Sequence, residues 1–387
     1  MATMLPDGRR LGAHLPIGDR MVRTADRAAE IGATALQIFG DNPTAWKRRA
    51  APAPDQAAFV ARIRELGIDP IVIHASYLIN LAGPDADFFE RSIGLLAAEL
   101  RDAPGLGARY VNIHVGSHRG SGVEVGIERL ADGILQALAR VEEAEAADPG
   151  DEAVRTDDAA GPADPLTPTI LLENSAGGGW GLGVSVLELA AVAEALDLRG
   201  IPRERVGFCL DTAHAWGAGY DLSDRPATDA LLHEFDTRIG IDRLSVVHLN
   251  DSKSALGSRT DRHAHIGAGE IGEAGMAHLL RHPLLAHATY ILETPGMEEG
   301  YDAINLARAI ALARGEPLVP LPPEALTLRG SRSRAARGAS VEVGAAVPEP
   351  VGAGGAALDE PAGAGSAATE PDRSLPQPDR SELAEGR

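Results

Sequence analysis

The chain has 387 residues, 44% of them hydrophobic, which is enough to build a large core. Its one cysteine, Cys209, excludes a disulfide framework and a cysteine-rich zinc site, and we interpret it as a packed core thiol. The net charge of −20 argues against nonspecific coating of nucleic acid. It does not settle the partner, because bound divalent cations can make one site locally positive.

The sequence shows no targeting or membrane signal. No basic segment followed by an apolar run stands at the N-terminus, and no stretch of 18 apolar residues occurs anywhere. We therefore expect no signal peptide and no membrane span, and a cytoplasmic location.

Short apolar runs alternate with longer helical patterns along the chain. The runs that predict strands are Leu11–Ile17, Ala35–Phe39, Ile71–His74, Tyr110–His114, Thr169–Glu173, Val206–Leu210, Leu244–His248 and Thr289–Glu293. The helical patterns that follow them are Thr24–Ile31, Gln56–Leu66, Phe88–Leu100, Ile127–Val141, Val186–Leu196, Thr228–Ile239, Met276–Leu280 and Ala303–Arg314. Eight strand–helix units predict an α/β fold in which a parallel sheet closes into a (β/α)8 TIM barrel.

Two segments do not fit this alternation. Residues 144–168 are rich in Ala, Asp, Pro and Gly, and we expect a disordered acidic insertion between the fourth helix and the fifth strand. Residues 331–387 contain almost no large apolar side chains, so we expect a disordered C-terminal tail. The barrel domain is then residues 1–330.

Six consecutive predicted strands end in, or just before, an imidazole or a carboxylate. These residues are His74, His114, Glu173, Asp211, His248 and Glu293, and His214 follows Asp211. In a closed barrel the carboxyl ends of the strands converge on one mouth, where active sites of this fold lie. The pattern therefore predicts a metal site.

The chemistry of these donors narrows the choice of metal. Imidazole and carboxylate without thiolate suit zinc, and also manganese or iron. A carboxylate such as Glu173 can bridge two ions, and a pair of ions about 3.5–4 Å apart suits in-line displacement at phosphorus.

The loop after the seventh strand carries further candidate ligands. Asp261 and His263 are two residues apart and, with His214, could form a separate three-ligand site; His265 could replace His263. Three positively charged side chains beside them could contact phosphates. They are Lys253, Arg259 and Arg262. The alternative is a charged loop that is only exposed to solvent.

The loop after the third strand carries Tyr77 and Leu78. Exposed side chains of this kind could wedge into a duplex from the minor groove. Packing of both residues onto the barrel rim is the alternative.

Several stretches together resemble the endonuclease IV family of apurinic/apyrimidinic (AP) endonucleases, across Leu11–Gly315. The stretches are HASYLINLA from His74, VNIHVGSH from Val111, LLENSAGGG from Leu171, GFCLDTAHAWGAGYD from Gly207, VVHLNDSKSALGSRTDRHAHIGAGEIG from Val246 and ILETPG from Ile291.

The resemblance implies a zinc-dependent, deoxyribonuclease IV-type hydrolase of base excision repair. Such an enzyme cuts double-stranded DNA 5′ to an abasic site and leaves a 3′-hydroxyl and a 5′-deoxyribose phosphate. The resemblance also implies that the abasic nucleotide is flipped into the mouth while loop side chains such as Tyr77 and Leu78 fill the gap. Flipping costs least where no base pairs or stacks.

The resemblance also implies the ligands of three zinc ions, with manganese able to occupy some sites. His74, His114 and Glu173 would hold the first ion, and Glu173 would bridge to the second. Asp211, His248 and Glu293 would complete the second site, and His214, Asp261 and His263 would hold the third. Glu293 would also orient or deprotonate the nucleophile, so Glu293 and Glu173 are the expected catalytic residues.

The second strand–helix loop departs from the family pattern. Thr44 stands where the family often has an Arg that inserts into the DNA stack, which puts the grip on the duplex in doubt. Lys47, Arg48 and Arg49 could compensate.

Two other functions compete with this one. One is a metal-dependent sugar isomerase or epimerase on a similar barrel, which would lack the pair Asp261 and His263. The other is a DNA- or metal-binding protein without turnover. We expect a monomer, because one barrel mouth must admit a bent duplex.

Overall fold

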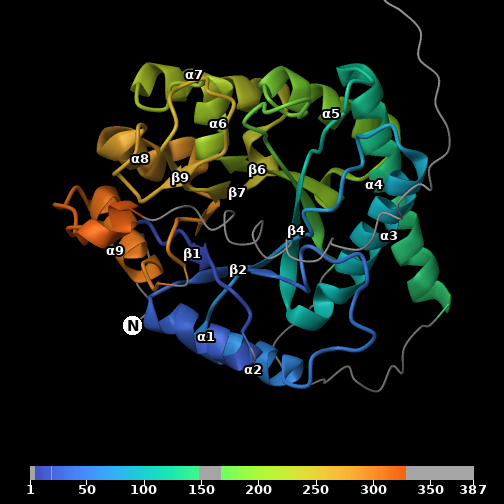
Figure 1. Ribbon diagram of the computed structural model, residues 1–387, viewed down its shortest axis with the longest axis horizontal. Coiled ribbons are helices and arrows are strands. Elements are labelled where there is room, and N and C mark those ends of the chain that lie inside the picture. The colour runs from blue at the N-terminus through green and yellow to red at the C-terminus, as the bar shows by residue number, and fades with distance from the viewer. Residues whose placement is uncertain (1–4, 19, 148–166, 298, 328–387) are drawn as a thin grey trace, which may run out of the picture. The chain divides into compact units, whose positions relative to one another are not determined.

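The structure is a computed structural model that describes residues 5–18, 20–147, 167–297 and 299–327, and in it eight strands close into a barrel (Figure 1). All neighbouring strands are parallel, and the last strand pairs with the first. The strands are β1 (Leu11–His14), β2 (Ala35–Phe39), β3 (Ile71–His74), β4 (Ala108–His114), β5 (Thr169–Glu173), β6 (Val206–Asp211), β7 (Leu244–His248) and β10 (Thr289–Leu292).

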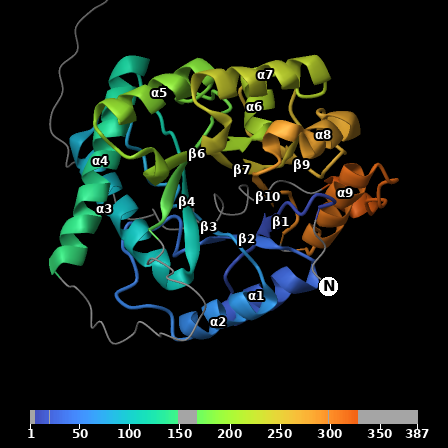
Figure 2. The ribbon, with the colours of Figure 1, turned by 180° about the vertical axis from the view of Figure 1, so that it is seen from behind.

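Helices surround these strands on the outside (Figures 1 and 2). The α-helices are α1 (Met21–Glu30), α2 (Gln56–Leu66), α3 (Ala86–Asp102), α4 (Val123–Ala147), α5 (Val186–Leu198), α6 (Thr212–Ala218), α7 (Arg225–Arg238), α8 (Gly272–Arg281) and α9 (Asp302–Arg314). Short 3₁₀ turns are η1 (Pro104–Leu106), η3 (Arg203–Arg205), η4 (Ile241–Arg243), η5 (Pro283–Leu285) and η6 (Pro323–Thr327). The TIM barrel predicted from the sequence is confirmed.

Side-chain caps explain where several helices begin. Asp85 accepts a hydrogen bond from the backbone N–H of Phe88, and Ser185 and Asp224 cap α5 and α7 in the same way. Gly67, with a φ of 65°, ends α2 in the left-handed conformation that a helix terminus favours. Because these capping residues are local, the alternation of strands and helices could be predicted from the sequence.

The inside of the barrel has an apolar layer beneath its mouth. This buried layer consists of Ala35, Val72, Leu171, Cys209, Val246 and Ile291, with Tyr110 packed against it. Burial raises the pKa of the Cys209 thiol to about 11, so this residue is a neutral core side chain. Because inward-facing positions recur every second residue, the next inward side chains on these strands lie at the mouth.

Several element boundaries differ from the sequence prediction. β1 ends at His14 rather than Ile17, since Pro16 has no N–H to donate to the ladder. α4 continues to Ala147, so the first residues assigned to the insertion are helical. The rest of the insertion, residues 148–166, and the tail, residues 331–387, lie outside the described residues.

One helix and one pair of short strands near the mouth were not predicted. α6 begins directly after β6, because Asp211 caps it by accepting from the backbone N–H of His214. The strands β8 (Asp251–Ser252) and β9 (His263–Ala264) form an antiparallel pair in the loop after β7. Both elements fix candidate ligands that the sequence placed on loops.

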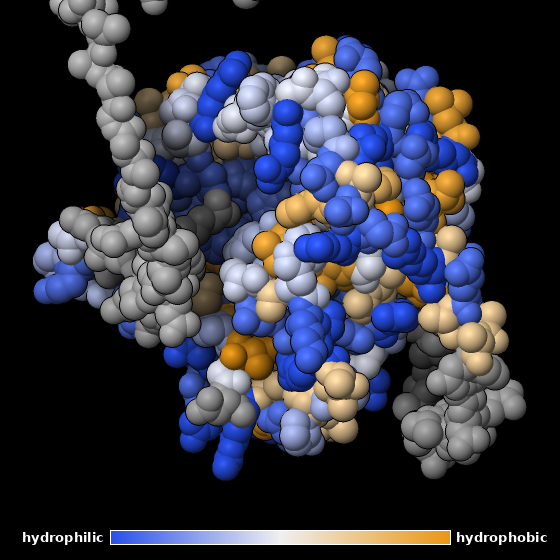
Figure 3. Space-filling model, turned by 45° about the vertical axis from the view of Figure 1, so that its right-hand side comes forward, coloured by the Kyte–Doolittle hydropathy of each residue, from blue (hydrophilic) through white to orange (hydrophobic). Residues whose placement is uncertain are grey.

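The surface of the described part is mixed in character. On the face shown in Figure 3, hydrophobic residues are scattered among hydrophilic ones rather than gathered in one broad patch. Within the described ranges, no helix combines the length and the apolar character needed to cross a membrane.

We predict that Gly12→Ala strongly destabilises the barrel. A methyl group at Gly12 would lie 2.0 Å from the backbone oxygen of Ala35 on the neighbouring strand, so β1 and β2 would have to separate. We expect the free energy of unfolding, measured by thermal unfolding monitored by circular dichroism, to fall by about 3 kcal/mol or more. Gly18→Ala is the matched control, because nothing lies within 4 Å of its added methyl group. Equal stability of the two variants would contradict this packing.

Candidate metal centre at the barrel mouth

The nine donor residues predicted from the sequence lie together at or beyond the carboxyl ends of the strands. His74, His114 and Glu173 form one group whose ligand atoms lie within 4.8 Å of one another. A second group of this kind is Glu173, Asp211, His248 and Glu293, and a third is Asp211, His214 and His263. Asp261 adjoins the third group. Glu173 therefore belongs to two groups, as does Asp211.

In the first group two imidazoles face one carboxylate oxygen. His74 donates from Nδ1 to the carbonyl oxygen of Ala75 at 2.9 Å, which leaves its Nε2 free to bind. The Nε2 atoms of His74 and His114 each lie 3.8 Å from Oε2 of Glu173. Asn112 donates a 2.7 Å hydrogen bond to the same oxygen and holds it in place.

In the second group a hydrogen bond from one ring nitrogen fixes the orientation of the His248 imidazole. Its Nε2 donates to Oε1 of Gln37 at 2.9 Å, so Nδ1 is the nitrogen left to bind a metal ion. That Nδ1 lies 3.3 Å from Oε2 of Glu293 and 3.5 Å from Oε1 of Glu173. Gln37 also donates to Oε1 of Glu293 at 2.7 Å.

In the third group Asp261 lies between two imidazoles. His214 donates from Nδ1 to the carbonyl of Asn174 at 2.9 Å, and its Nε2 lies 3.4 Å from Oδ2 of Asp261. His263 donates from Nδ1 to the carbonyl of Glu293 at 2.8 Å, and its Nε2 lies 3.0 Å from Oδ1 of Asp261. Both free nitrogens therefore point at the same carboxylate.

The donor set fits metal ions. Three buried ring nitrogens have no hydrogen-bond partner, namely Nε2 of His114, Nδ1 of His248 and Nε2 of His263, one from each group. Ligand atoms about 2.0–2.2 Å from a tetrahedral ion lie roughly 3.3–3.6 Å apart. The nitrogen–oxygen separations in the three groups, 3.0 to 3.8 Å in the contacts given above, bracket that spacing.

Electrostatics keep Glu173 charged and His74 neutral, whereas the pKa values of His214, His248 and His263 are raised despite their burial. Burial would raise the pKa of Glu173, but the imidazoles of His114 and His248 outweigh it and hold that pKa well below its usual range. Burial lowers the pKa of His74 to about 4, so its imidazole is neutral. A charged carboxylate beside a neutral imidazole suits a divalent cation.

Four amide side chains orient the ligands, and none of them was predicted from the sequence. They are Gln37, Asn112, Asn174 and Asn250. Asn250 donates to Oδ2 of Asp211 at 2.8 Å and accepts from the backbone N–H of Glu293 at 2.8 Å. Gln37 and Asn112 could have been noticed, because each interrupts an apolar strand at an inward-facing position.

The geometry favours His263 over His265 as the donor in the third group. His265 is 1% exposed, and its Nε2 donates to the carbonyl of Ala325 at 3.0 Å. Its Nδ1 accepts from Asn305 at 3.0 Å. Both nitrogens of His265 are thus engaged elsewhere, and the pairing of β8 with β9 turns His263 toward the mouth.

The residues predicted to contact DNA lie on the surrounding loops. Tyr77 is 48% exposed, and its ring centroid lies 5.4 Å from that of His74, so it stands over the first group. Leu78 is half-buried against the core. Of the three cations, Arg259 and Arg262 are exposed and Lys253 is half-buried. Arg259 adopts a φ of 54°, a strained conformation of the kind found at functional sites.

In the loop between β2 and α2, fewer side chains are available to contact DNA than the sequence predicted. Arg48 is committed to Glu99 through two hydrogen bonds of 2.9 and 3.1 Å. Thr44 is exposed but is folded back onto Asn42, to which its backbone N–H and its hydroxyl both donate. On the loop after β5, however, Trp180 is 58% exposed, an aromatic side chain that the sequence analysis did not single out.

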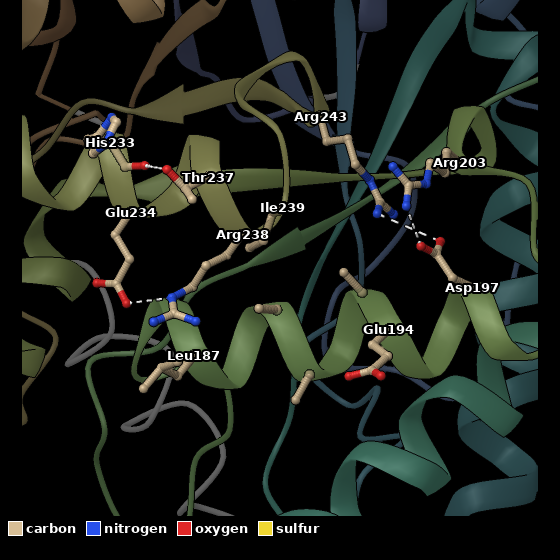
Figure 4. Close-up of a pocket in the computed structure, with 13 residues that line it drawn as sticks. Leu187, Glu194, Asp197, Arg203, His233, Glu234, Thr237, Arg238, Ile239 and Arg243 are labelled. Carbon is tan, nitrogen blue, oxygen red and sulfur yellow. Dashed lines mark hydrogen bonds and ion pairs between the residues drawn. The ribbon is translucent and has the colours of Figure 1, made fainter.

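A separate groove of about 820 Å³ lies between α5 and α7 on the outside of the barrel (Figure 4). It is lined by residues such as Leu187, Glu194 and Arg243, and it shares none of the nine donors. Ion pairs between side chains of its own lining, including that of Arg203 with Asp197 at 2.7 Å, cross part of it.

Comparisons with known proteins agree on a single family. Residues 25–313 match the family model described as xylose isomerase-like TIM barrel. The chain is 40% identical over 303 residues to a probable endonuclease 4 of Methanoculleus marisnigri, which covers 78% of this chain and 98% of that protein. It is 42% identical over 305 residues to a probable endonuclease 4 of Oleidesulfovibrio alaskensis, covering 78% of this chain and 94% of that protein.

Solved structures point the same way. Endonuclease IV from Thermus thermophilus superposes with a TM-score of 0.64 at 36% sequence identity, covering 79% of this chain and 99% of that one. A 3-keto-D-glucoside 4-epimerase from E. coli has a TM-score of 0.52 at 12% identity, covering 79% of this chain and 99% of that one, which shows a shared fold only.

We predict that divalent metal binds more tightly as the pH rises from 6 to 8. Burial would lower the pKa of His263, but the carboxylates of Asp211 and Asp261 raise it to about 9 in the metal-free protein. Since metal ligands must be deprotonated and the pKa of His214 in the same group is also raised, each ion bound there displaces at least one proton, and its affinity should rise at least about tenfold per pH unit below that pKa. Competition with a chromophoric zinc chelator measures this dependence. Equal affinity at pH 6 and pH 8 would contradict it.

Proposed function

The chain belongs to the endonuclease IV family of xylose isomerase-like TIM barrels, and we propose that it hydrolyses the DNA phosphodiester 5′ to an abasic site with the help of zinc ions. The products are a 3′-hydroxyl and a 5′-deoxyribose phosphate, which makes the enzyme part of base excision repair. The observation that carries this proposal is the set of nine imidazole and carboxylate donors gathered at one mouth in three groups.

The ligands divide among three ions. His74, His114 and Glu173 would hold the first, and Glu173 would also contribute to the second. Asp211, His248 and Glu293 would complete the second, and His214, Asp261 and His263 would hold the third. This division is supported by one unpartnered ring nitrogen in each group. Zinc suits imidazole and carboxylate ligands, and manganese can replace it at some of the sites.

Bound at these sites, divalent cations lower the pKa of water and stabilise negative charge on the reacting phosphate and the departing oxygen. The protein itself fixes the geometry. Glu293, 17% exposed at its side chain, is the one carboxylate of the second group that reaches the open mouth, where it can orient or deprotonate the attacking water. Gln37 holds Glu293 through Oε1, so that Oε2 keeps its direction. Glu173 is the second catalytic carboxylate, because it joins two groups.

The rim loops hold the duplex. Tyr77 stands beside the first group and can fill the gap left by an abasic nucleotide that has turned into the mouth. Leu78 adds apolar contact next to it. Arg259, Arg262 and Lys253 lie on the loop of the third group, where they can neutralise phosphates.

Trp180 compensates for Thr44, which stands where the family often has an Arg that inserts into the DNA stack. Tyr77 and Trp180 are the only aromatic side chains among the large hydrophobic residues found exposed in the described part, and both follow strands that end in a ligand. An exposed indole can stack on a base of the bent duplex. The enzyme acts as a cytoplasmic monomer, since a single mouth carries every group that the reaction needs.

A sugar isomerase or epimerase remains the second candidate, because one such enzyme shares the fold. The third donor group argues against it, since isomerisation on this barrel needs only one or two ions. A duplex with one tetrahydrofuran abasic analogue separates the candidates. Incision on the 5′ side supports the proposed function. Sugar isomerisation without incision, or binding without turnover, would replace it.

We predict that Glu293→Gln keeps the fold and its zinc but lowers the incision rate by about 10²- to 10⁴-fold, because the amide cannot take a proton from water. The amide oxygen can still accept from Gln37, so the barrel should melt as the wild type does. Single-turnover incision of the same duplex measures the loss. Glu299→Gln, an exposed carboxylate in the same loop, is the control and should cut at the wild-type rate. Normal cutting by Glu293→Gln would remove Glu293 from the reaction.

A further inference from the structure

A second kind of donor cluster lies in the outer helical layer, apart from the nine donors at the mouth. It consists of Asp229 on α7, His278 on α8 and His282 at the C-terminal end of α8. The end of α8 leads through η5 to the amino end of β10, whereas the mouth lies at the carboxyl ends of the strands. None of the three residues belongs to the proposed endonuclease site.

His278 lies in the last turn of α8 and His282 is the residue that caps its C-terminus, so the two rings lie close together. Their Nε2 atoms point at one oxygen: His278 lies 2.6 Å and His282 lies 3.2 Å from Oδ1 of Asp229. The ring centroids are 5.3 Å apart and the rings are perpendicular. The candidate ligand atoms of all three residues lie within 4.8 Å of one another.

We propose that Asp229, His278 and His282 form a site for a divalent transition-metal ion, with zinc as the ion of choice, that clamps α7 to α8. Two imidazoles and one carboxylate are the ligand types that such ions take, and three protein ligands leave one position for water. The site is independent of the proposed endonuclease activity, because it shares no residue with the mouth.

Small adjustments convert the cluster into a metal site. Asp229 is exposed, so its carboxylate can rotate and open the 2.6 Å contact to the spacing that two ligands of one ion require. His282 accepts a long 3.3 Å hydrogen bond at Nδ1 from the backbone N–H of Leu284; with metal on Nε2 the ring proton moves to Nδ1, and this weak bond is given up. Burial lowers the pKa of His282, so its ring is neutral at pH 7 and ready to bind.

The chain supplies a matched set of variants. His278→Gln/His282→Gln removes both imidazoles, and Asp229→Asn removes the charge at an exposed position where folding is not at risk. His233→Gln is the control, because His233 is an exposed histidine on the same helix as Asp229 but outside the cluster. The full chain is used throughout.

The experiment is equilibrium dialysis of each protein against micromolar free zinc, followed by elemental analysis. We expect the wild type and His233→Gln to hold one more ion per chain than the double variant and Asp229→Asn. Zinc should also raise the unfolding temperature of the wild type more than that of these two variants, while incision stays unchanged. If all four proteins bind the same number of ions, the cluster is only a hydrogen-bonded contact between helices and the proposal fails. Should the double variant not fold, the zinc content of Asp229→Asn decides alone.

Discussion

The arrangement at the mouth depends on how the negative charge of the buried Glu173 carboxylate is neutralised. It is 1% exposed, and imidazoles from His114, His214 and His248 face its two oxygens at 3.8, 3.2 and 3.5 Å. A charged group buried this deeply persists only where opposite charge and hydrogen-bond donors surround it. Protons on His214 and His248, whose pKa values are raised well above the usual imidazole range despite burial, supply that charge in the metal-free protein, and divalent cations supply it when they bind. The donors are thus held near their working positions before any ion arrives.

The barrel turns this local requirement into a site. Along β5, β6 and β7 an apolar side chain packs in the interior and a donor follows two residues later, as with Cys209 and Asp211. Each of these strands therefore has an unreactive side chain in the barrel interior and a candidate ligand at its carboxyl end. Rigid strands therefore carry the candidate ligands, while the exposed aromatic side chains Tyr77 and Trp180 lie on the loops that follow β3 and β5. This separation explains how Thr44 can depart from the family pattern without disturbing the metal centre.

Much of this could be predicted from the sequence, because the informative signals are short-range. Strand ends, helix caps and the donor at each strand terminus lie within a few residues of one another, as at Asp211 and His214. What could not be predicted depends on contacts between distant segments. The amide of Gln37 serves His248, which is 211 positions away, and only closure of the barrel brings them together. Likewise, spacing alone could not choose between His263 and His265; the pairing of β8 with β9 and the burial of His265 against Ala325 make that choice.

The central claim is that the nine donors at the mouth hold divalent cations at three positions. Crystals of zinc-loaded protein, measured on both sides of the zinc absorption edge, test it most directly. We predict three anomalous peaks at the mouth, one in each donor group, with Glu173 contacting two of them. A map without peaks among these side chains, from protein that still incises an abasic duplex, would contradict the account.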